Sequence, residues 1–231
     1  MKNSTPGSQV EFKGLFGRDY HYTRRNFPTV RFSLQCRINA TSHGISKLFP
    51  SGVDRLLDLG SADGLLAKGI NTLVPNINHI YALDRDRNLL KYNPFPSIQG
   101  DCCRLPFADH TFEVITATAL IEHLHEPDLL LTECCRVLKP AGALLLTSPS
   151  PFFEWVAAKI GYLRNSGHVA RYSLRELEKL CKNAGFEIVI SRKFQISPFY
   201  LPAHYFLEAA LRRLGLSFLM MNQLIGCIKE K

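Results

Sequence analysis

The 231-residue sequence contains no uninterrupted apolar run of about 18 residues, so no membrane-spanning helix is expected. Its opening stretch, MKNSTPGSQVEFKG, lacks the apolar core of a signal peptide, and no segment is repeated or of low complexity. The seven cysteines form no CxxC pair and no ladder with histidine, which argues against a metal site. Their odd number, without a leader, fits the cytoplasm, where most would be small core residues.

What is present is ordinary in amount but uneven in charge. Residues 1–50 carry eight Lys/Arg and two Asp/Glu, or +6, whereas residues 51–155 carry eight and thirteen, or −5. Residues 156–231 carry twelve and five, or +7. The basic ends are either solvated faces or a means of attracting an anionic partner, such as acidic lipid, a charged substrate or RNA. Because the basic residues form pairs and no long runs, they give little support for nucleic acid.

Strand and helix patterns alternate along the middle of the chain. Apolar runs predict strands at 53–60, 79–84, 97–101, 112–120, 143–149, 186–194 and 222–230. Helical patterns occur at 30–48, 64–74, 87–92, 127–139, 172–186 and 203–214. Strands that alternate with helices indicate βαβ units, and therefore a parallel sheet covered on both faces.

End signals support two of these helices. Lys139 would complement the dipole of the helix at 127–139, and Ala141-Gly142 would end it. Ser173 and Glu176 have the spacing of a capping box at the start of the helix near 174, and Gly185 would follow its end.

Residues 56–64, LLDLGSADG, join the first strand of the sheet to a helix through small residues. Gly60, Ala62 and Gly64 would allow a ligand to approach the backbone, and the helix would offer free N–H groups. Asp58 is an acid inside a buried strand, where a carboxylate must be satisfied. We expect it to hold N–H groups of the turn, or to meet a cationic group of the ligand.

Two further acids end the next two predicted strands. Asp84 follows Gly64 by twenty residues, which suits an acid that accepts hydrogen bonds from ribose hydroxyls. Asp101 ends the third strand and could accept from an adenine amino group. The structural alternatives are helix capping for Asp84 and a simple turn for Asp101.

These features resemble a class I S-adenosylmethionine-dependent methyltransferase. The most specific match is FADHTFEVIT…IEHL…ECCRVLKPAGALLLTSP, and the pattern is similar to the quinone-biosynthesis O-methyltransferases. The resemblance spans about residues 50–231 and implies a Rossmann-like, doubly wound α/β sheet of seven mostly parallel strands, the last one antiparallel. Residues 1–50 would form a covering segment and helix, and substrate-cap insertions would lie near 150–172 and 197–221.

The resemblance also assigns the cofactor, S-adenosylmethionine, and its product, S-adenosylhomocysteine. The residues that it places at the cofactor are Asp58, Gly60, Ala62, Gly64, Asp84, Arg85, Asp101, Cys102, Ala117 and Thr118. Ala62 departs from the usual central glycine of the family, and we expect this to have a modest effect. Cys102 could equally be a packing residue.

Histidines occur where the resemblance places the methyl acceptor. His123 and His168 are the candidate catalytic residues. His123 is the favoured general base, because an imidazole can take a proton from a hydroxyl near neutral pH, and His168 would act at the substrate end. Glu122, His125 and Tyr172 are their neighbours in sequence. The alternative for these residues is to begin a helix or to fix a loop.

The acceptor is expected to be a small molecule, apolar or anionic, with O-methylation favoured. Residues 199–221 are aromatic and apolar with a basic pair, which suits peripheral contact with a membrane as well as simple covering of the sheet. The alternatives are a non-catalytic methyltransferase-like partner protein and an RNA methyltransferase. A nicotinamide dehydrogenase is disfavoured, because its last fingerprint glycine is Leu65 here. The oligomeric state and the methylated atom stay open.

Overall fold

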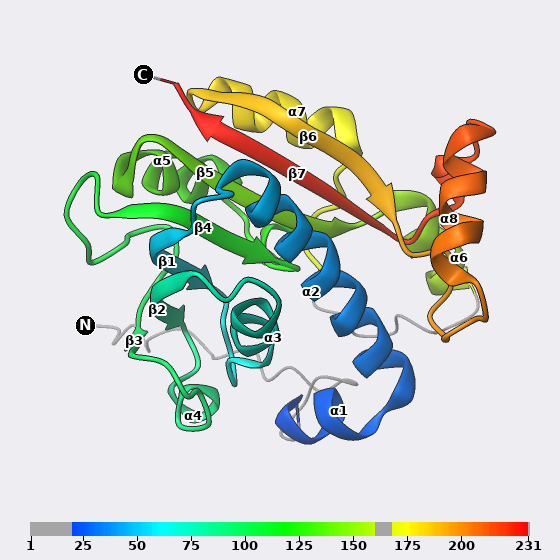
Figure 1. Cartoon of the computed structure of the whole chain (residues 1–231), viewed down its shortest axis with the longest axis horizontal. Coiled ribbons are helices and arrows are strands. Elements are labelled where there is room, and N and C mark those ends of the chain that lie inside the picture. The colour runs from blue at the N-terminus through cyan, green and yellow to red at the C-terminus, as the bar shows by residue number, and fades with distance from the viewer. Residues whose placement is uncertain (1–19, 160–167, 231) are drawn as a thin grey trace, which may run out of the picture.

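A seven-stranded sheet organises the described part of the chain, which is residues 20–159 and 168–230 of the computed structural model (Figure 1). The strand order is β3-β2-β1-β4-β5-β7-β6. The pairs among β1 to β5 are parallel, and β7 is antiparallel to both β5 and β6. The strands are β1 (Val53–Leu59), β2 (Ile77–Asp84), β3 (Ser97–Gln99), β4 (Phe112–Thr118), β5 (Leu138–Pro149), β6 (Phe186–Phe194) and β7 (Asn222–Lys229). The predicted Rossmann-like sheet, including its antiparallel last strand, is confirmed.

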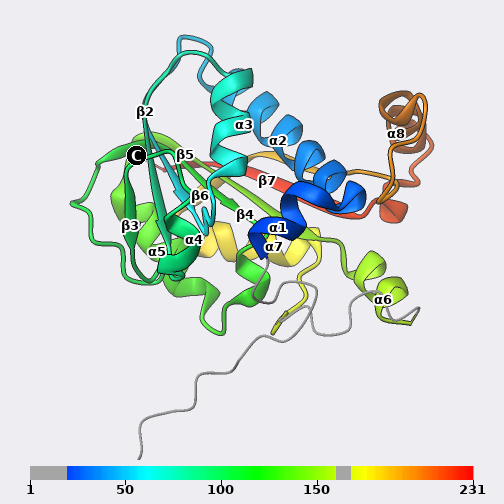
Figure 2. The same ribbon diagram turned by 90° about the horizontal axis from the view of Figure 1, so that it is seen from below.

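Helices cover both faces of this sheet (Figure 2). Helices α2 and α3 pack on one face, and α5 and α7 on the other. The helices are α1 (Tyr20–Asn26), α2 (Pro28–Leu48), α3 (Leu65–Leu73), α4 (Arg87–Leu90), α5 (Pro127–Val137), α6 (Pro151–Lys159), α7 (Leu174–Asn183) and α8 (His204–Arg213), with short 3-10 turns η1 (Ile121–His123) and η2 (Ser217–Leu219). None of the helices in the described ranges is both long and apolar enough to cross a membrane.

Alternation along the central strands builds the two cores. Leu56 of β1 faces α2 and α3, whereas Leu57 and Leu59 face α5 and α7. All three side chains are fully buried, and burying one leucine is worth about 1.5–3 kcal/mol. The sheet is therefore fixed in register, because a slip by one residue would exchange the side chains of the two cores.

The end of α5 differs from the prediction. This helix ends at Val137 and continues directly into β5, so Ala141-Gly142 does not end it. Leu138 already pairs with Phe112 of β4, and the register then shifts before the pairing resumes at Val114. The expected role of Lys139 at the helix dipole was wrong, because its ammonium group forms an ion pair with Glu113. Arg136 is the basic residue of the last helical turn.

Other predicted end signals are present. The Ser173 hydroxyl accepts the N–H of Glu176, and the Glu176 carboxylate accepts the N–H of Ser173, which completes the capping box of α7. Gly185 follows that helix with a φ of +86°. The helix predicted at 203–214 is α8. Of the expected covering segments, residues 1–19 and 160–167 lie outside the described residues.

Candidate functional site

The turn between β1 and α3 is the first component of the site. Gly60, Ala62 and Gly64 all have a positive φ, at +66°, +49° and +73°. A Cβ atom at Gly64 would lie 2.6 Å from Oδ1 of Asn93, so glycine is required there for two reasons. Ala62 adopts the left-handed conformation despite its Cβ, which costs roughly 1–2 kcal/mol. The turn is held by its own N–H groups, because those of Gly60 and Ser61 donate to the carbonyl of Leu83 and that of Gly64 donates to the carbonyl of Ser61.

Asp84, at the end of β2, is bound to this turn. Its Oδ2 accepts the N–H of Ala62 at 2.8 Å, and its Oδ1 accepts the N–H of Asp86 at 2.8 Å. Burial raises the pKa of Asp84, and these two N–H groups act in the opposite direction. A carboxylate has about four acceptor positions, so Asp84 can hold the turn and still accept from two ribose hydroxyls.

Asp58 is fully buried in β1, and the hydroxyls of Thr116 and of Ser61 in the turn lower its pKa against the effect of burial. Its Oδ1 accepts the hydroxyl of Thr116 on β4 at 2.7 Å. Its Oδ2 is buried and has no hydrogen-bond partner within the described ranges. Burial raises the pKa of Asp58 to about 6. The expected contact of Asp58 with a cationic group of a ligand stays a prediction.

The third strand supplies the opposite end of the site. Asp101 follows β3, accepts the N–H of Cys103 at 2.9 Å and pairs with Nη2 of Arg85 at 3.0 Å. The N–H of Cys103 is the main reason why the pKa of Asp101 lies below its usual value. The Cys102 side chain is buried in the core, where burial raises the pKa of its thiol to about 12. Only the backbone of Cys102 is therefore suited to ligand contact.

Ala117 and Thr118 complete this edge of the sheet. Ala117 of β4 pairs with Leu59 of β1, directly before the glycine turn. Its side chain is fully buried, whereas Thr118 is half-buried. The ends of β1, β2, β3 and β4 therefore bring together the residues that the sequence predicted at the cofactor.

Helix α1 covers the turn through one buried acid that the sequence analysis missed. Asp63 is 1% exposed, and its carboxylate contacts His21 at 2.9 Å, Arg24 at 2.9 Å and Arg25 at 3.6 Å. The charge of Arg24 also opposes the raised pKa values of Asp58 and Asp84. The basic pair and the turn are almost forty residues apart, so no local pattern connects them.

The predicted histidines meet beyond the end of β4. The rings of His123 and His168 lie 4.8 Å apart at an angle of 76°. Nδ1 of His168 contacts Oε1 of Glu154 on α6, and Arg171 lies 3.3 Å from the other oxygen of that carboxylate. Burial raises the pKa of Glu122, next to His123, to about 7. The structure thus assembles an acceptor-side cluster, Glu122, His123 and His168, with Glu154 behind it.

The neighbours His125 and Tyr172 lie outside this cluster. His125 is exposed, and Tyr172 packs against the core that α5 and α7 cover. Neither residue has a contact that indicates a role in binding.

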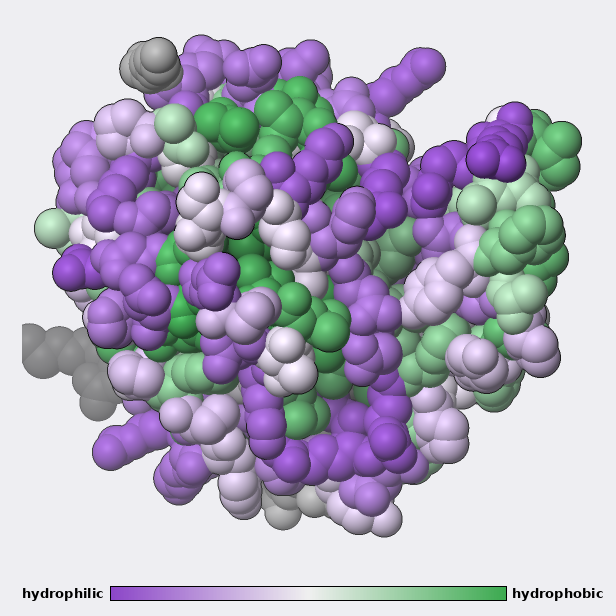
Figure 3. Space-filling model, viewed as in Figure 1, coloured by the Kyte–Doolittle hydropathy of each residue, from purple (hydrophilic) through white to green (hydrophobic). Residues whose placement is uncertain are grey.

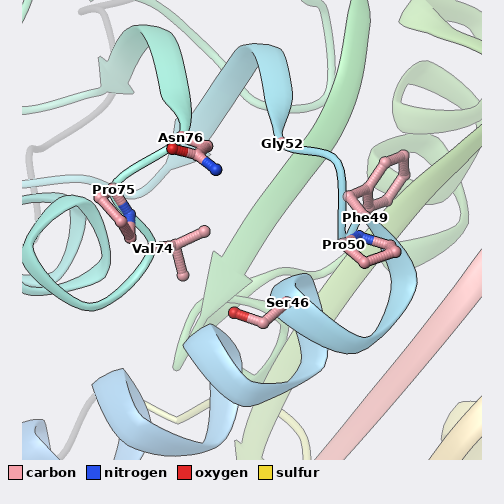
Figure 4. A pocket seen from close by; sticks show the side chains of 7 residues that line it. All are labelled: Ser46, Phe49, Pro50, Gly52, Val74, Pro75 and Asn76. Carbon is pink, nitrogen blue, oxygen red and sulfur yellow. The ribbon is translucent and has the colours of Figure 1, made fainter.

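Two of the hollows in the described part of the chain lie along α2. A small pocket of about 90 Å³ lies between the end of α2 and the loop after α3, lined by Ser46, Phe49, Pro50, Gly52, Val74, Pro75 and Asn76 (Figure 4). It is at the amino ends of β1 and β2, so it is not part of the site. A groove of about 590 Å³ runs between α2 and α3, and Arg24, Arg25, Arg31 and Lys68 are among its lining residues.

Comparisons with known proteins give a consistent result. A family model described as "Methyltransferase domain" matches residues 33–191. The chain is 29% identical over 131 residues to the ubiquinone/menaquinone biosynthesis C-methyltransferase UbiE of Chromobacterium violaceum, covering 48% of this chain and 54% of the relative. It is 25% identical over 151 residues to the ubiquinone biosynthesis O-methyltransferase of Azoarcus sp., covering 58% and 65%. The chain spans about half the length of the curated relatives it matches.

Solved structures share the fold. A possible histamine N-methyltransferase of Thermotoga maritima superposes with a TM-score of 0.69 at 18% identity, over 94% of this chain and 99% of that one. A putative methyltransferase of Haloferax volcanii, solved in complex with the Trm112 methyltransferase activator, matches with a TM-score of 0.69 at 16% identity, over 92% and 96%. With the matched family model, the chain therefore belongs to the methyltransferase domain family of class I S-adenosylmethionine-dependent methyltransferases.

Proposed function

We propose that this chain transfers a methyl group from S-adenosylmethionine to a small-molecule acceptor, and that the acceptor atom is oxygen. Oδ2 of Asp58 is the observation that carries the cofactor assignment, because it is a buried acceptor without a partner in the described ranges, beside the glycine turn. The ammonium group of the cofactor's amino-acid end supplies the donor that such an atom requires. Asp84 would accept the ribose hydroxyls, and Asp101, with the backbone of Cys102, would flank the adenine.

When bound, the cofactor supplies a methyl group already activated by a sulfonium. The residues of this chain then have two tasks, which are to align the acceptor and to receive its proton. Alignment alone can supply several kcal/mol of the acceleration. Ala117 and Thr118 end β4 beside the turn, so they would position the methyl-donor end against the acceptor-side cluster.

His168 is the proposed general base. Its Nδ1–H faces the buried Glu154 carboxylate, which leaves Nε2 as the atom that can accept a proton. His123 lies against its ring and is the second candidate. Replacing a general base costs about 100- to 10,000-fold in rate, so His168→Asn should lower kcat by that range while the affinity for S-adenosylhomocysteine is retained. His125→Asn, two residues from His123, is the matched control and should leave both unchanged.

Calorimetric titration of S-adenosylhomocysteine tests the cofactor assignment. Each hydrogen bond to a charged group is worth about 1.5–3 kcal/mol, so the loss of two in Asp84→Ala should weaken binding by about 100-fold or more. Asp86→Ala removes an exposed acid two residues away and should bind as the wild type does. Absence of binding by folded wild type would favour a non-catalytic partner protein that keeps only the fold.

The acceptor cap is proposed to consist of residues 150–172 and 197–221, added to a methyltransferase domain at 51–231, with 1–50 as the covering segment. Helix α8 supports this, because it buries a charged side chain and exposes an apolar one. Glu208 is 8% exposed, whereas Phe206 is 73% exposed. Inside, Glu208 accepts the N–H of Gln195 at 3.1 Å and pairs with Arg212 at 2.6 Å. Figure 3 shows the apolar residues gathered over this helix.

This outward apolar face, next to Arg213, supports peripheral contact with an anionic membrane through residues 199–221. Vesicles that contain phosphatidylglycerol should sediment the protein at low salt, and vesicles of phosphatidylcholine alone should not. Phe206→Ser should reduce sedimentation, whereas Leu73→Ser, on α3, should have no effect. Equal sedimentation of the two variants would rule out α8 as the contact. We also infer a cytoplasmic location, which suits free thiols.

The second candidate, an RNA methyltransferase, has one specific observation in its favour. The groove between α2 and α3 has Arg24, Arg25, Arg31 and Lys68 among its lining residues. Radiolabelled transfer from S-adenosylmethionine to total RNA, compared with transfer to phenolic small molecules, separates the two functions. Incorporation into RNA that falls with Arg31→Ala and Lys68→Ala would favour methylation of RNA over methylation of a small molecule.

A further inference from the structure

The acceptor-side cluster contains the donor atoms of a possible metal site as well as a candidate general base. One atom each from Glu122, His123 and His168, an oxygen or a ring nitrogen, lies within 4.8 Å of the other two. We propose that these three residues bind a divalent transition-metal ion, with zinc the ion that the donors suit best.

The first reason is the carboxylate of Glu122. The residue is 1% exposed, and both of its side-chain oxygens are buried without a hydrogen-bond partner in the described part of the chain. A buried carboxylate is costly unless it is paired or coordinates a metal. A cation held jointly with the histidines would satisfy it.

The second reason is the support behind His168. Metal-binding histidines usually donate their other ring N–H to a carboxylate, which fixes the tautomer and orients the ring. Here Nδ1 of His168 faces Oε1 of Glu154, and Arg171 balances the charge of that carboxylate. The backbone holds the two halves together, because the Glu122 carbonyl accepts the N–H of Val169 at 2.9 Å. The ligand from the loop is therefore fixed against the ligands from η1.

The donor set selects the class of ion. Two imidazole nitrogens and one carboxylate oxygen suit zinc and its first-row neighbours, whereas magnesium and calcium prefer oxygen ligands throughout. Three protein ligands also leave a position open, as in catalytic zinc sites. A hydroxyl of the acceptor bound there would lose its proton to solvent water more easily, so the ion would replace Nε2 of His168 as the means of activation. This last step depends on the proposed methyl transfer, whereas binding of the ion does not.

A second group of potential ligands in the described ranges is weaker. Asp101, Cys102 and Cys103 also lie close together. The Asp101 carboxylate, however, already accepts the N–H of Cys103 and pairs with Arg85. It lacks the unpartnered buried oxygens that distinguish Glu122.

Cobalt(II) and zinc(II) titrations of the full chain test the proposal. Wild type should bind one equivalent of cobalt with the visible absorption of nitrogen and oxygen ligation and without a thiolate charge-transfer band, and zinc should displace it. Glu122→Gln and His168→Asn should each weaken zinc binding by more than about tenfold, and Glu154→Gln by about 10- to 100-fold through the orientation of His168. The controls, His125→Asn and Cys103→Ser, should bind as wild type does.

Three results would overturn the proposal: no binding by folded wild type, equal affinity in wild type, Glu122→Gln and His168→Asn, or a loss confined to Cys103→Ser with a thiolate band in the wild type. Circular dichroism checks that each variant is folded. S-adenosylhomocysteine is titrated into the same samples, because its binding reports on the cofactor site alone. Failure of the metal site with intact cofactor binding is thereby distinguished from failure of the proposed function.

Discussion

Asp58 gives the sharpest test of the cofactor site, because its burial should make stability depend on pH. Its pKa is raised from 3.8 to about 6, mainly by burial. One pKa unit corresponds to about 1.4 kcal/mol, so ionisation of this group costs the folded state about 3 kcal/mol. A folded-state pKa above the unfolded value means that the contribution to stability is complete below pH 3.8 and is lost as the pH rises through 6.

The assay is urea unfolding of wild type and Asp58→Asn between pH 4 and pH 8. Asparagine keeps an oxygen for the Thr116 hydroxyl but cannot ionise. We expect the difference in unfolding free energy to move in favour of the variant by about 2–3 kcal/mol across this range, mostly between pH 4 and pH 6, with little further change above pH 7. Comparison of the two proteins removes the contribution of other groups, including Glu122. Asp54→Asn, an exposed acid on the same strand, should show no such change above pH 5.

Saturating S-adenosylhomocysteine should abolish the effect. If the ammonium group of the ligand meets Oδ2 of Asp58, it stabilises the ionised form, so the affinity of wild type should increase as the pH rises through 6. The affinity of Asp58→Asn should not increase in this way. A constant difference in stability between the two proteins at all pH values would refute the argument from burial. A pH-dependent stability without a pH-dependent affinity would refute only the contact with the ammonium group.

The remaining predictions concern the turn and its cover. Asp63→Asn removes the carboxylate charge that Arg24 contacts at 2.9 Å and should lower the free energy of unfolding in urea by about 1.5–3 kcal/mol, whereas an effect below 1 kcal/mol would mean that α1 is not held by this acid. Gly64→Ala combines a positive φ with a collision at Asn93 and should destabilise by about 2–4 kcal/mol in the same assay. Ala62→Gly relieves the strain of a left-handed alanine but raises the conformational entropy of the unfolded chain. The free energy of unfolding should therefore stay within about 1 kcal/mol of the wild-type value. Calorimetry of Ala62→Gly should show the wild-type affinity for S-adenosylhomocysteine, and a large gain would mean that Ala62 impairs the site.

The sequence was sufficient for the sheet because its signals are local and repeated. Runs such as ALLL at 143–146 can only be buried on both faces, and the small residues of the turn mark where a strand meets a helix. The prediction failed at 138–142, where the strand begins directly after α5. There a tertiary contact decided the outcome, because Leu138 pairs with Phe112, and pairing with another strand leaves no trace in the local pattern.

The site was predictable in proportion to how close its parts lie to the turn. Gly60, Asp84 and Ala117 follow from the ends of adjacent strands. The contact of Arg24 with Asp63 of the turn and the contact of His168 with Glu154 both join distant segments of the chain. The sequence could therefore suggest the residue types but not their partners. The contact of Asp84 with the N–H of Ala62 was missed for the same reason, because it joins the turn to another strand.

The arrangement of charge explains why the cofactor is easier to assign than the acceptor. In the proposed function the acids near the turn serve a ligand of fixed shape, so their type and spacing are constrained: Asp58 would meet the ammonium group and Asp84 the ribose hydroxyls. Beyond β4, the proposed tasks are only to hold an acceptor oxygen in line and to remove its proton, and the cluster of Glu122, His123 and His168 would do this whatever molecule carries the oxygen. Acceptor choice is then left to the apolar cap, where shape selects more than charge does. Exchange of residues in the cap should therefore change the acceptor while cofactor affinity is retained.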